Sequence, residues 1–191
     1  MKRTALLLSL LVLLVIAGCR ETVAAASVDA AWQALRAGEA VALIRHAVAP
    51  GIGDPPNFDI GDCATQRTLS EEGRAQSRLI GETFRARGIS DAAVFSSQWC
   101  RCLETARLLG FGTVEVETAL NSFFAEPGRA EEQTAALQDV IAKLPRERPS
   151  ILVTHQVNIT AMTGVYPASG EIVILQTGGN GQPMVLGRFV P

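Results

Sequence analysis

Short, wholly apolar runs alternate along the chain with longer segments that are apolar on one side only. Val41 to Ile44 and Ile151 to Val153 show no polar/apolar alternation, which is typical of strands buried on both faces of a parallel sheet. Strands that alternate with amphipathic helices build a mostly parallel sheet with helices on both faces. We therefore expect an α/β fold with three layers, α/β/α, around a mostly parallel central sheet.

Capping residues and glycines mark the ends of the expected helices. Ser70 is suited to cap a helix that Gly88 ends. Within this helix we expect Leu79, Ile80 and Phe84 to face the core. The expected helices cover residues 28–37, 71–87, 99–109, 129–144 and 156–162.

The expected strands cover residues 41–45, 92–95, 113–116, 150–154, 171–176 and 184–189. The last two resemble a hairpin, joined through the glycine-rich residues 178–181. Residues 48–62, directly after the first strand, contain three prolines and three glycines and predict an irregular loop. Because a loop of this length in a compact domain is usually functional, we expect it to shape a substrate pocket.

Length and composition indicate one globular domain. The chain has 191 residues, of which 48% are hydrophobic and 19% are charged, as in folded rather than disordered proteins. The net charge of −2 gives no reason to expect nucleic acid as a partner. We find no internal repeat and no second domain, and the oligomeric state stays open.

The N-terminal residues have the pattern of an export signal. Lys2-Arg3 precedes an apolar run over residues 5–17, which is shorter than the roughly 20 residues of a membrane-spanning helix. Ile16-Ala17-Gly18-Cys19 resembles the bacterial lipobox, in which the cysteine is lipidated. We expect a lipoprotein signal peptide over 1–18, a tether over 19–26 and one domain over 27–191, with a lipid anchor on the membrane. An ordinary secretory signal or an uncleaved anchor is the alternative.

Three cysteines remain once Cys19 is set aside: Cys63, Cys100 and Cys102. An oxidising compartment outside the cytoplasm permits a disulfide, and Cys100 and Cys102 are too close along the chain to pair comfortably. We therefore expect a Cys63–Cys100 disulfide, with Cys102 as a buried free thiol. A zinc site is the alternative, but a C-x-C pair with one distant cysteine matches no usual spacing.

The two histidines of the chain each follow an apolar strand, at Arg45-His46 and at His155. Carboxyl ends of parallel strands share one edge of a sheet, where open α/β sheets bind ligands, so these side chains and Arg101 should converge. Arginine matches phosphate oxygens bidentately, and its charge keeps a nearby imidazole neutral and nucleophilic. We expect a phosphate site without a metal or other cofactor. Two histidines as metal ligands, with carboxylates close by, are the alternative.

Four segments resemble, in order, the motifs of the histidine phosphatase superfamily, which includes the phosphoglycerate mutases and acid phosphatases. They are Leu43-Ile44-Arg45-His46-Ala47 (R-H-G), Arg67-Thr68-Leu69-Ser70-Glu71-Glu72-Gly73-Arg74 (R-x-L-S/T-x-x-G), Ser96 to Ala106 (S-S-x-x-x-R-x-x-x-T-A) and Val153-Thr154-His155 (the second histidine motif). One Arg-His pair alone is weak, whereas the ordered set is specific and spans residues 41–160. The resemblance implies a phosphoglycerate mutase-like fold.

The resemblance also implies roles for single residues. His46 would be the nucleophile that becomes phosphohistidine. Arg45, Arg101 and His155 would bind the phosphoryl group, and His155 would also stabilise the transition state. Arg67, which would mainly support the first loop, and Asn121 complete the expected substrate-binding residues.

Two departures from the family pattern affect these expectations. Ala47 stands where glycine is usual, a change that we expect to be tolerated. The proton-donating carboxylate of a Leu-x-Glu segment is absent, because Leu120-Asn121-Ser122 occupies its place. Glu126 is the nearest substitute, and Asp62 and Asp54 are the other candidates, so mutase activity is not expected.

We therefore expect a lipid-anchored, extracytoplasmic phosphatase that cleaves a small phosphomonoester through phosphohistidine. Small envelope members of the family act on phosphorylated sugars of lipopolysaccharide, which suggests an envelope sugar phosphate as the substrate. A protein phosphohistidine phosphatase is one alternative, although its known setting is cytoplasmic. A catalytically inactive lipoprotein that binds phosphorylated or anionic envelope ligands is the other.

Overall fold

A computed structural model of the protein describes residues 28–177 and 183–191. The expected signal peptide (1–18), Cys19, the tether (19–26) and the glycine-rich join at 178–181 lie outside these described residues. Over the described part of the chain, none of the helices combines the length and the apolar character needed to cross a membrane.

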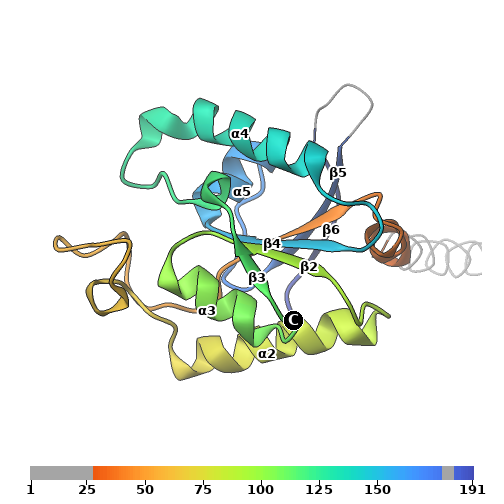
Figure 1. The fold of residues 1–191 in the computed structure, drawn as a ribbon, viewed down its shortest axis with the longest axis horizontal. Coiled ribbons are helices and arrows are strands. Elements are labelled where there is room, and N and C mark those ends of the chain that lie inside the picture. The colour runs from red at the N-terminus through yellow and green to blue at the C-terminus, as the bar shows by residue number, and fades with distance from the viewer. Residues whose placement is uncertain (1–27, 178–182) are drawn as a thin grey trace, which may run out of the picture.

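A six-stranded sheet forms the centre of the molecule, in the order β3-β2-β4-β1-β5-β6 (Figure 1). The first four strands of this order run parallel to one another, and β5 and β6 are antiparallel at one edge. The mostly parallel sheet is thus confirmed. The strands are β1 (Val41–Arg45), β2 (Ala93–Ser96), β3 (Val114–Val116), β4 (Ser150–Thr154), β5 (Ile172–Thr177) and β6 (Pro183–Phe189).

Helices cover both faces of the sheet, as the three-layer expectation requires. In Figure 1, α2 and α3 lie below the sheet, and α4 and α5 lie above it. A helix over 28–36 precedes β1. The other helical elements are α2 (Glu71–Ala86), α3 (Cys100–Leu108), α4 (Ala130–Lys143), α5 (Gln156–Thr163) and the 3-10 turns η1 (Cys63–Thr65), η2 (Thr118–Leu120) and η3 (Pro127–Arg129).

The alternation of side chains along β1 divides the core into two clusters. Ala42 and Ile44 belong to a cluster with Trp32 of the first helix and with residues of α2 and α3. Val41 and Leu43 belong to the other cluster, with residues of α4 and α5. A strand buried on both faces has no polar side, which explains the unbroken apolar run in the sequence.

One expected core position is wrong. Leu79 is 46% exposed, whereas Ser77, Ile80, Gly81 and Phe84 form the buried side of α2. Two of these inward positions carry small residues that a search for large apolar side chains does not select. The buried side of the helix thus contains Ile80 and Phe84, as expected, but not Leu79, and the helix bounds agree within one residue.

The sheet order brings the two histidine-bearing strands together. β1 and β4 are neighbours, and Arg45 is paired with Thr154, so His46 and His155 leave the sheet side by side. The chain then continues to α2 on one face after β1 and to α5 on the other face after β4 (Figure 1). Connections that diverge in this way open a crevice at the carboxyl edge of a parallel sheet.

Candidate active site

A cavity of about 180 Å³ lies at this edge of the sheet. Its walls come from the end of β1, the loop after it, α3, and the segments around 122–124 and 155–166. The ionisable side chains that line it include Arg45, His46, Asp54, Arg67, Arg101 and His155. The two histidines and the two arginines that the sequence predicts to meet thus share one cavity.

His46 is held in a single tautomer. Its Nδ1 lies 2.8 Å from the carbonyl oxygen of Ala47, and because a carbonyl oxygen only accepts, Nδ1 carries the proton. Nε2 keeps its lone pair and accepts a hydrogen bond from Nε of Arg101 at 3.2 Å. The side chain is only 5% exposed. Nε2 is therefore the nitrogen that can attack an electrophile held in the cavity.

Burial and neighbouring charge keep both histidines neutral. Burial, and then the charge of Arg101, lowers the pKa of His46 from 6.5 to about 3, against the opposing effect of the Ala47 hydrogen bond. Burial comes first among the causes that hold the pKa of His155 well below 6.5, followed by unfavourable electrostatic coupling to His46 and by the charge of Arg101. A neutral imidazole among cationic arginines is a nucleophile beside an anion site.

His155 is oriented by a chain of hydrogen bonds that leads away from the cavity. Its Nε2 lies 2.9 Å from Oγ of Ser97, and this hydroxyl donates to Oδ1 of Asn121 at 3.3 Å. Because the hydroxyl has one proton, it accepts from Nε2. Nδ1 then faces Nη2 of Arg101 at 3.5 Å, and the His155 and His46 ring centroids lie 5.5 Å apart.

Arg101 is the central side chain of the site. Nε and Nη2 of its guanidinium face His46 and His155, whereas Nη1 donates to Oδ1 of Asp54 at 2.9 Å. The side chain of Arg101 is 3% exposed and that of Asp54 is 17% exposed. The other oxygen of Asp54 accepts from Nε1 of Trp99 at 3.0 Å. One guanidinium therefore connects both histidines with a carboxylate.

Arg45 and Arg67 add two further positive charges to the cavity lining. Nη1 of Arg45 donates to the carbonyl of Pro167 at 3.0 Å, while its Nε is buried without a protein partner. Arg67 donates to the carbonyls of Gly53 and Ala49, each at 2.6 Å. Arg67 thus holds the loop after β1, as the sequence suggests, and it also lies in the cavity wall. Burial, followed by the charge of Arg101, lowers the pKa of Arg67.

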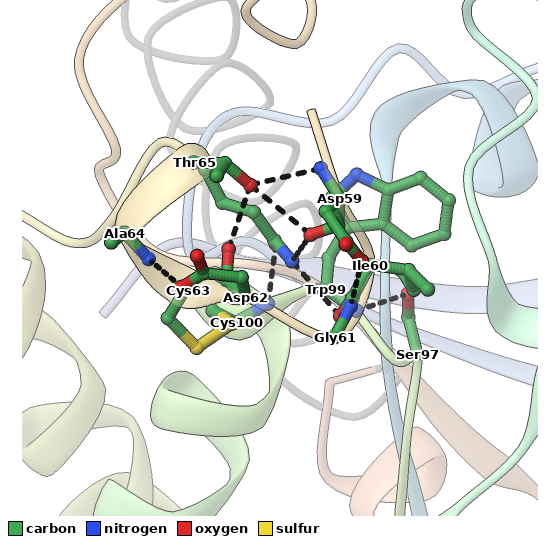
Figure 2. Close-up of a disulfide and its surroundings, with 11 residues drawn as sticks. Asp59, Ile60, Gly61, Asp62, Cys63, Ala64, Thr65, Ser97, Trp99 and Cys100 are labelled. Carbon is green, nitrogen blue, oxygen red and sulfur yellow. Dashed lines mark hydrogen bonds between the residues drawn. A yellow bond between two sulfur atoms is a disulfide. The ribbon is translucent and has the colours of Figure 1, made fainter. Parts of the chain in front are cut away.

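A disulfide fixes the same loop to the start of α3. The structure contains the expected Cys63–Cys100 bridge, and Cys102 is a buried free cysteine. Figure 2 shows the bridge between η1 and the residue that directly precedes Arg101. The backbone N–H of Cys100 also donates to Oε1 of Gln66 at 3.0 Å. Loop and helix are therefore joined next to the central arginine.

The structure places two expected site residues outside the cavity. Glu126 is exposed at the start of η3, and Asn121 instead accepts hydrogen bonds from Ser97 and from the backbone of Gln98. Neither lines the cavity, so Asn121 positions Ser97 rather than contacting a ligand there. Among the candidate proton donors, Asp62 caps η1 and Asp54 lies in the cavity.

The cavity has an apolar rim, in which Ile52 and Tyr166 were not predicted from the sequence, whereas for Phe124 a pocket wall and plain core were equally open. Ile52, Phe124 and Tyr166 line its mouth and are 90%, 50% and 70% exposed. All three lie outside helices and strands, where periodicity gives no orientation. The sequence gives one indication of such rim residues, which is a large apolar side chain in an irregular segment that does not pack into the core.

Metal ligands do not gather at this site. In residues 28–177 and 183–191, no group of three or more His, Cys, Asp or Glu side chains is placed to hold a metal ion. The positive charge of the cavity comes from its arginines.

An α/β/α fold with a neutral histidine and three arginines in one cavity at the carboxyl edge of its sheet defines a site for an anion such as a phosphoryl group. The model of the histidine phosphatase superfamily (branch 1) matches residues 41–126, which contain His46 and Arg101. This part of the chain is thus similar to the superfamily, whose motifs the chain resembles in order.

Solved structures of low sequence identity share the fold. The protein histidine phosphatase SixA in complex with tungstate is 19% identical with a TM-score of 0.57, over 80% of this chain and 97% of that chain. The product of open reading frame Rv3214 from Mycobacterium tuberculosis is 18% identical with a TM-score of 0.58, over 77% and 95%. A mycobacterial glucosyl-3-phosphoglycerate phosphatase is 18% identical with a TM-score of 0.56, over 77% and 96%. No curated protein sequence matches the chain.

Proposed function

We propose that this protein is an exported phosphatase that hydrolyses a small phosphomonoester through a phosphohistidine at His46. The observation that carries the proposal is the tautomer of His46. Its Nδ1 proton is committed to the Ala47 carbonyl, so the lone pair of Nε2 is available in a cavity lined by Arg45 and Arg101. A nucleophile beside a phosphate-binding charge is what covalent phosphoryl transfer requires.

In the proposed reaction each side chain has a task. Nε2 of His46 forms a bond to phosphorus while the bond from phosphorus to the leaving oxygen breaks. The guanidinium groups of Arg45 and Arg101 hold the negative charge of the transferring group, and His155, oriented by Ser97, lines the same cavity beside it. Water then attacks the phosphohistidine and releases orthophosphate, without a metal-dependent step. Positioning and charge stabilisation supply most of the acceleration in such reactions.

The test is hydrolysis of 4-nitrophenyl phosphate by the full chain, with and without a chelator, together with radioactive labelling from phosphate-labelled substrate. We expect turnover that a chelator does not reduce, and an acid-labile, base-stable label on the protein. His46→Ala should lose at least about 10³-fold in kcat and all of the label, because the chain has only one other histidine.

Arg78→Ala is a matched control, because Arg78 is an exposed arginine on α2 and does not line the cavity. It should retain the activity that Arg101→Ala loses. Binding of inorganic phosphate without turnover by the unmodified protein would contradict the enzyme and favour an inactive binding protein.

The proposed setting is the outer side of a bacterial membrane, with Cys19 as the lipid-bearing residue. Two features support export: the N-terminal pattern of the sequence and the Cys63–Cys100 disulfide, which suits an oxidising compartment. Labelled palmitate should be incorporated into the full chain and not into Cys19→Ala. Incorporation into both forms would exclude Cys19 as the lipidation site.

For the substrate we propose an envelope sugar phosphate. Phe124 and Tyr166, exposed at the mouth of the cavity, offer aromatic surface on which an apolar sugar face can pack while the phosphoryl group reaches the arginines. A panel of sugar phosphates and phosphohistidine peptides tests this choice. Higher kcat/KM for the peptides would identify a protein phosphohistidine phosphatase instead.

A further inference from the structure

Among the residues that the structure describes, Asp54 supplies the carboxyl side chain of the cavity wall. The family motifs leave the donor of the leaving-group proton unassigned in this sequence, and Glu126 lies exposed outside the cavity. A phosphomonoester with an alcohol leaving group needs such a proton, because an alkoxide leaves poorly. The cavity therefore offers Asp54 where the reaction needs a carboxylic acid.

The position of Asp54 matches the path of the leaving group. His46, at 5% exposure, lies deep in the cavity, so a group expelled opposite its attack moves toward the mouth. Asp54 follows Gly53, where an added Cβ would lie 3.6 Å from the ring of Phe124 at that mouth. A single guanidinium, that of Arg101, separates the carboxylate from the attacking nitrogen.

Contacts on both sides of Asp54 fix the carboxylate before substrate arrives. Arg67 binds the carbonyl of Gly53 at 2.6 Å, and Trp99 donates to Oδ2 of Asp54 at 3.0 Å. The ring of Trp99 in turn stacks on Phe58 of the same loop, with centroids 5.3 Å apart. Figure 2 shows Trp99 beside the loop that the disulfide anchors to α3. A group held in place in this way loses little entropy when it reacts.

We propose that Asp54 is the catalytic proton donor to the leaving group and the proton acceptor in the hydrolysis step, an assignment that rests on the phosphohistidine mechanism above. In the first step the Nε2–P bond forms, the P–O bond to the leaving group breaks, and the acid form of Asp54 gives its proton to the leaving oxygen. In the second step the water oxygen bonds to phosphorus and the P–N bond breaks. Asp54 takes a proton of that water, which restores the acid form.

The contact with Arg101 places the carboxyl of Asp54 beside the bound phosphoryl group. Nη1 of Arg101 lies 2.9 Å from Oδ1 of Asp54, and Nε and Nη2 of the same guanidinium face His46 and His155. A phosphoryl group that binds this guanidinium therefore lies next to Asp54.

The experiment compares two leaving groups in Asp54→Asn, using an alkyl phosphate and 2,4-dinitrophenyl phosphate. We expect kcat for the alkyl phosphate to fall about 10²-fold or more. Labelling of His46 by the dinitrophenyl ester should fall far less, because dinitrophenolate leaves without a proton. The labelled phosphoenzyme should accumulate in the variant, since its hydrolysis lacks the acceptor. Inorganic phosphate should inhibit the variant at least as tightly as the unmodified protein, because Arg101 is released.

Glu126→Gln is the matched control and should behave as the unmodified protein. Asp54→Glu, which keeps an acid on a longer side chain, should recover part of the loss, and thermal denaturation checks that each variant is folded. Equal loss of the rate of His46 labelling with both esters, or no loss with either, would overturn the assignment. So would a Tyr166→Phe variant that shows this leaving-group dependence while Asp54→Asn behaves as the unmodified protein. Absence of label on the unmodified protein would instead refute the phosphohistidine mechanism itself.

Discussion

The neutral state of two buried histidines makes the stability of this protein dependent on pH. Unfolding restores the ordinary pKa of 6.5 to His46 and His155, whereas folding lowers the pKa of His46 to about 3 and that of His155 well below 6.5. Below pH 6.5 the unfolded chain therefore binds more protons than the native protein. Stability is fully present above that pH and is lost as the pH falls, by up to about 1.4 kcal/mol per pH unit for each histidine.

Urea unfolding between pH 7.5 and 5 measures this slope. The double variant His46→Gln, His155→Gln removes both groups and should show a much flatter dependence over the same range. Burial raises the pKa of Glu171, the buried partner of Arg188, but its hydrogen bonds to Arg188 and Ala168 lower the pKa by more than burial raises it. Glu171 therefore titrates below this range and contributes little to the comparison. Identical slopes for the two proteins would show that the histidines are charged in the native state.

Residue positions could be predicted from the sequence only where strands fix them. His46 and His155 follow two apolar runs, and parallel pairing then brings the residues after each run to one edge. Glu126 and Asn121 lie in an irregular segment without a register, and proximity in sequence to a family motif gave no information on the direction of either side chain. For the same reason Asp54 ranked behind Glu126 among the candidate proton donors.

At the scale of elements, the close contact between α2 and the start of the long loop deserves a direct test. A Cβ on Gly73 would lie 2.1 Å from the carbonyl oxygen of Val48, a backbone atom that also accepts from the N–H of Ser70 at 3.0 Å. Gly73→Ala should therefore destabilise the protein by at least about 1–3 kcal/mol. It should also reduce kcat, because Val48 lies two residues after His46. Chemical denaturation and the 4-nitrophenyl phosphate assay measure the two effects.

Gly128→Ala provides the comparison, since a Cβ at this position in η3 meets no atom within 4 Å. Its unfolding free energy should change by no more than about 0.5 kcal/mol. An equally small change for Gly73→Ala would mean that helix and loop can separate without cost. The glycine of the R-x-L-S/T-x-x-G motif would then have no packing role here.

The strands and helices were predictable because each has a local signal, and their bounds agree within one or two residues. The inward side of α2 was not, since Ser77 and Gly81 occupy buried positions without being large or apolar. Gly81 allows the close approach of the Leu109 carbonyl. Such a contact depends on the partner element, which no pattern within the helix reveals.

At the scale of the whole molecule, the order of the strands comes from tertiary pairing. The sequence predicts six strands and a mostly parallel sheet, but the central position of β1 and β4 depends on which connections cross which face. The antiparallel β5 and β6 complete one edge, and Gly170 next to β5 donates its N–H to the carbonyls of Arg45 and His46. The last part of the chain thus supports the first histidine, over a separation that no local pattern spans.

The state of the four cysteines reports on export, lipidation and folding of the whole chain together. The structure pairs Cys63 with Cys100 and leaves Cys102 free, and burial raises the pKa of the Cys102 thiol to about 12, so it stays protonated in the folded protein. If Cys19 carries the proposed lipid, its sulfur is also blocked. Thiol titration of the exported chain in denaturant should then find one reactive thiol, Cys102, and three after reduction.

The same chain retained in the cytoplasm of the expressing cell should show four thiols, because neither oxidation nor lipidation takes place there. Cys19→Ala, exported as an unlipidated protein, should again show one thiol before reduction and three after, but it should no longer sediment with membranes. Two thiols before reduction in the exported full chain would mean that Cys19 is unmodified, and three or more would mean that the disulfide has not formed. Each count thus separates failure of the anchor from failure of the bridge that holds the loop bearing Asp54 against α3.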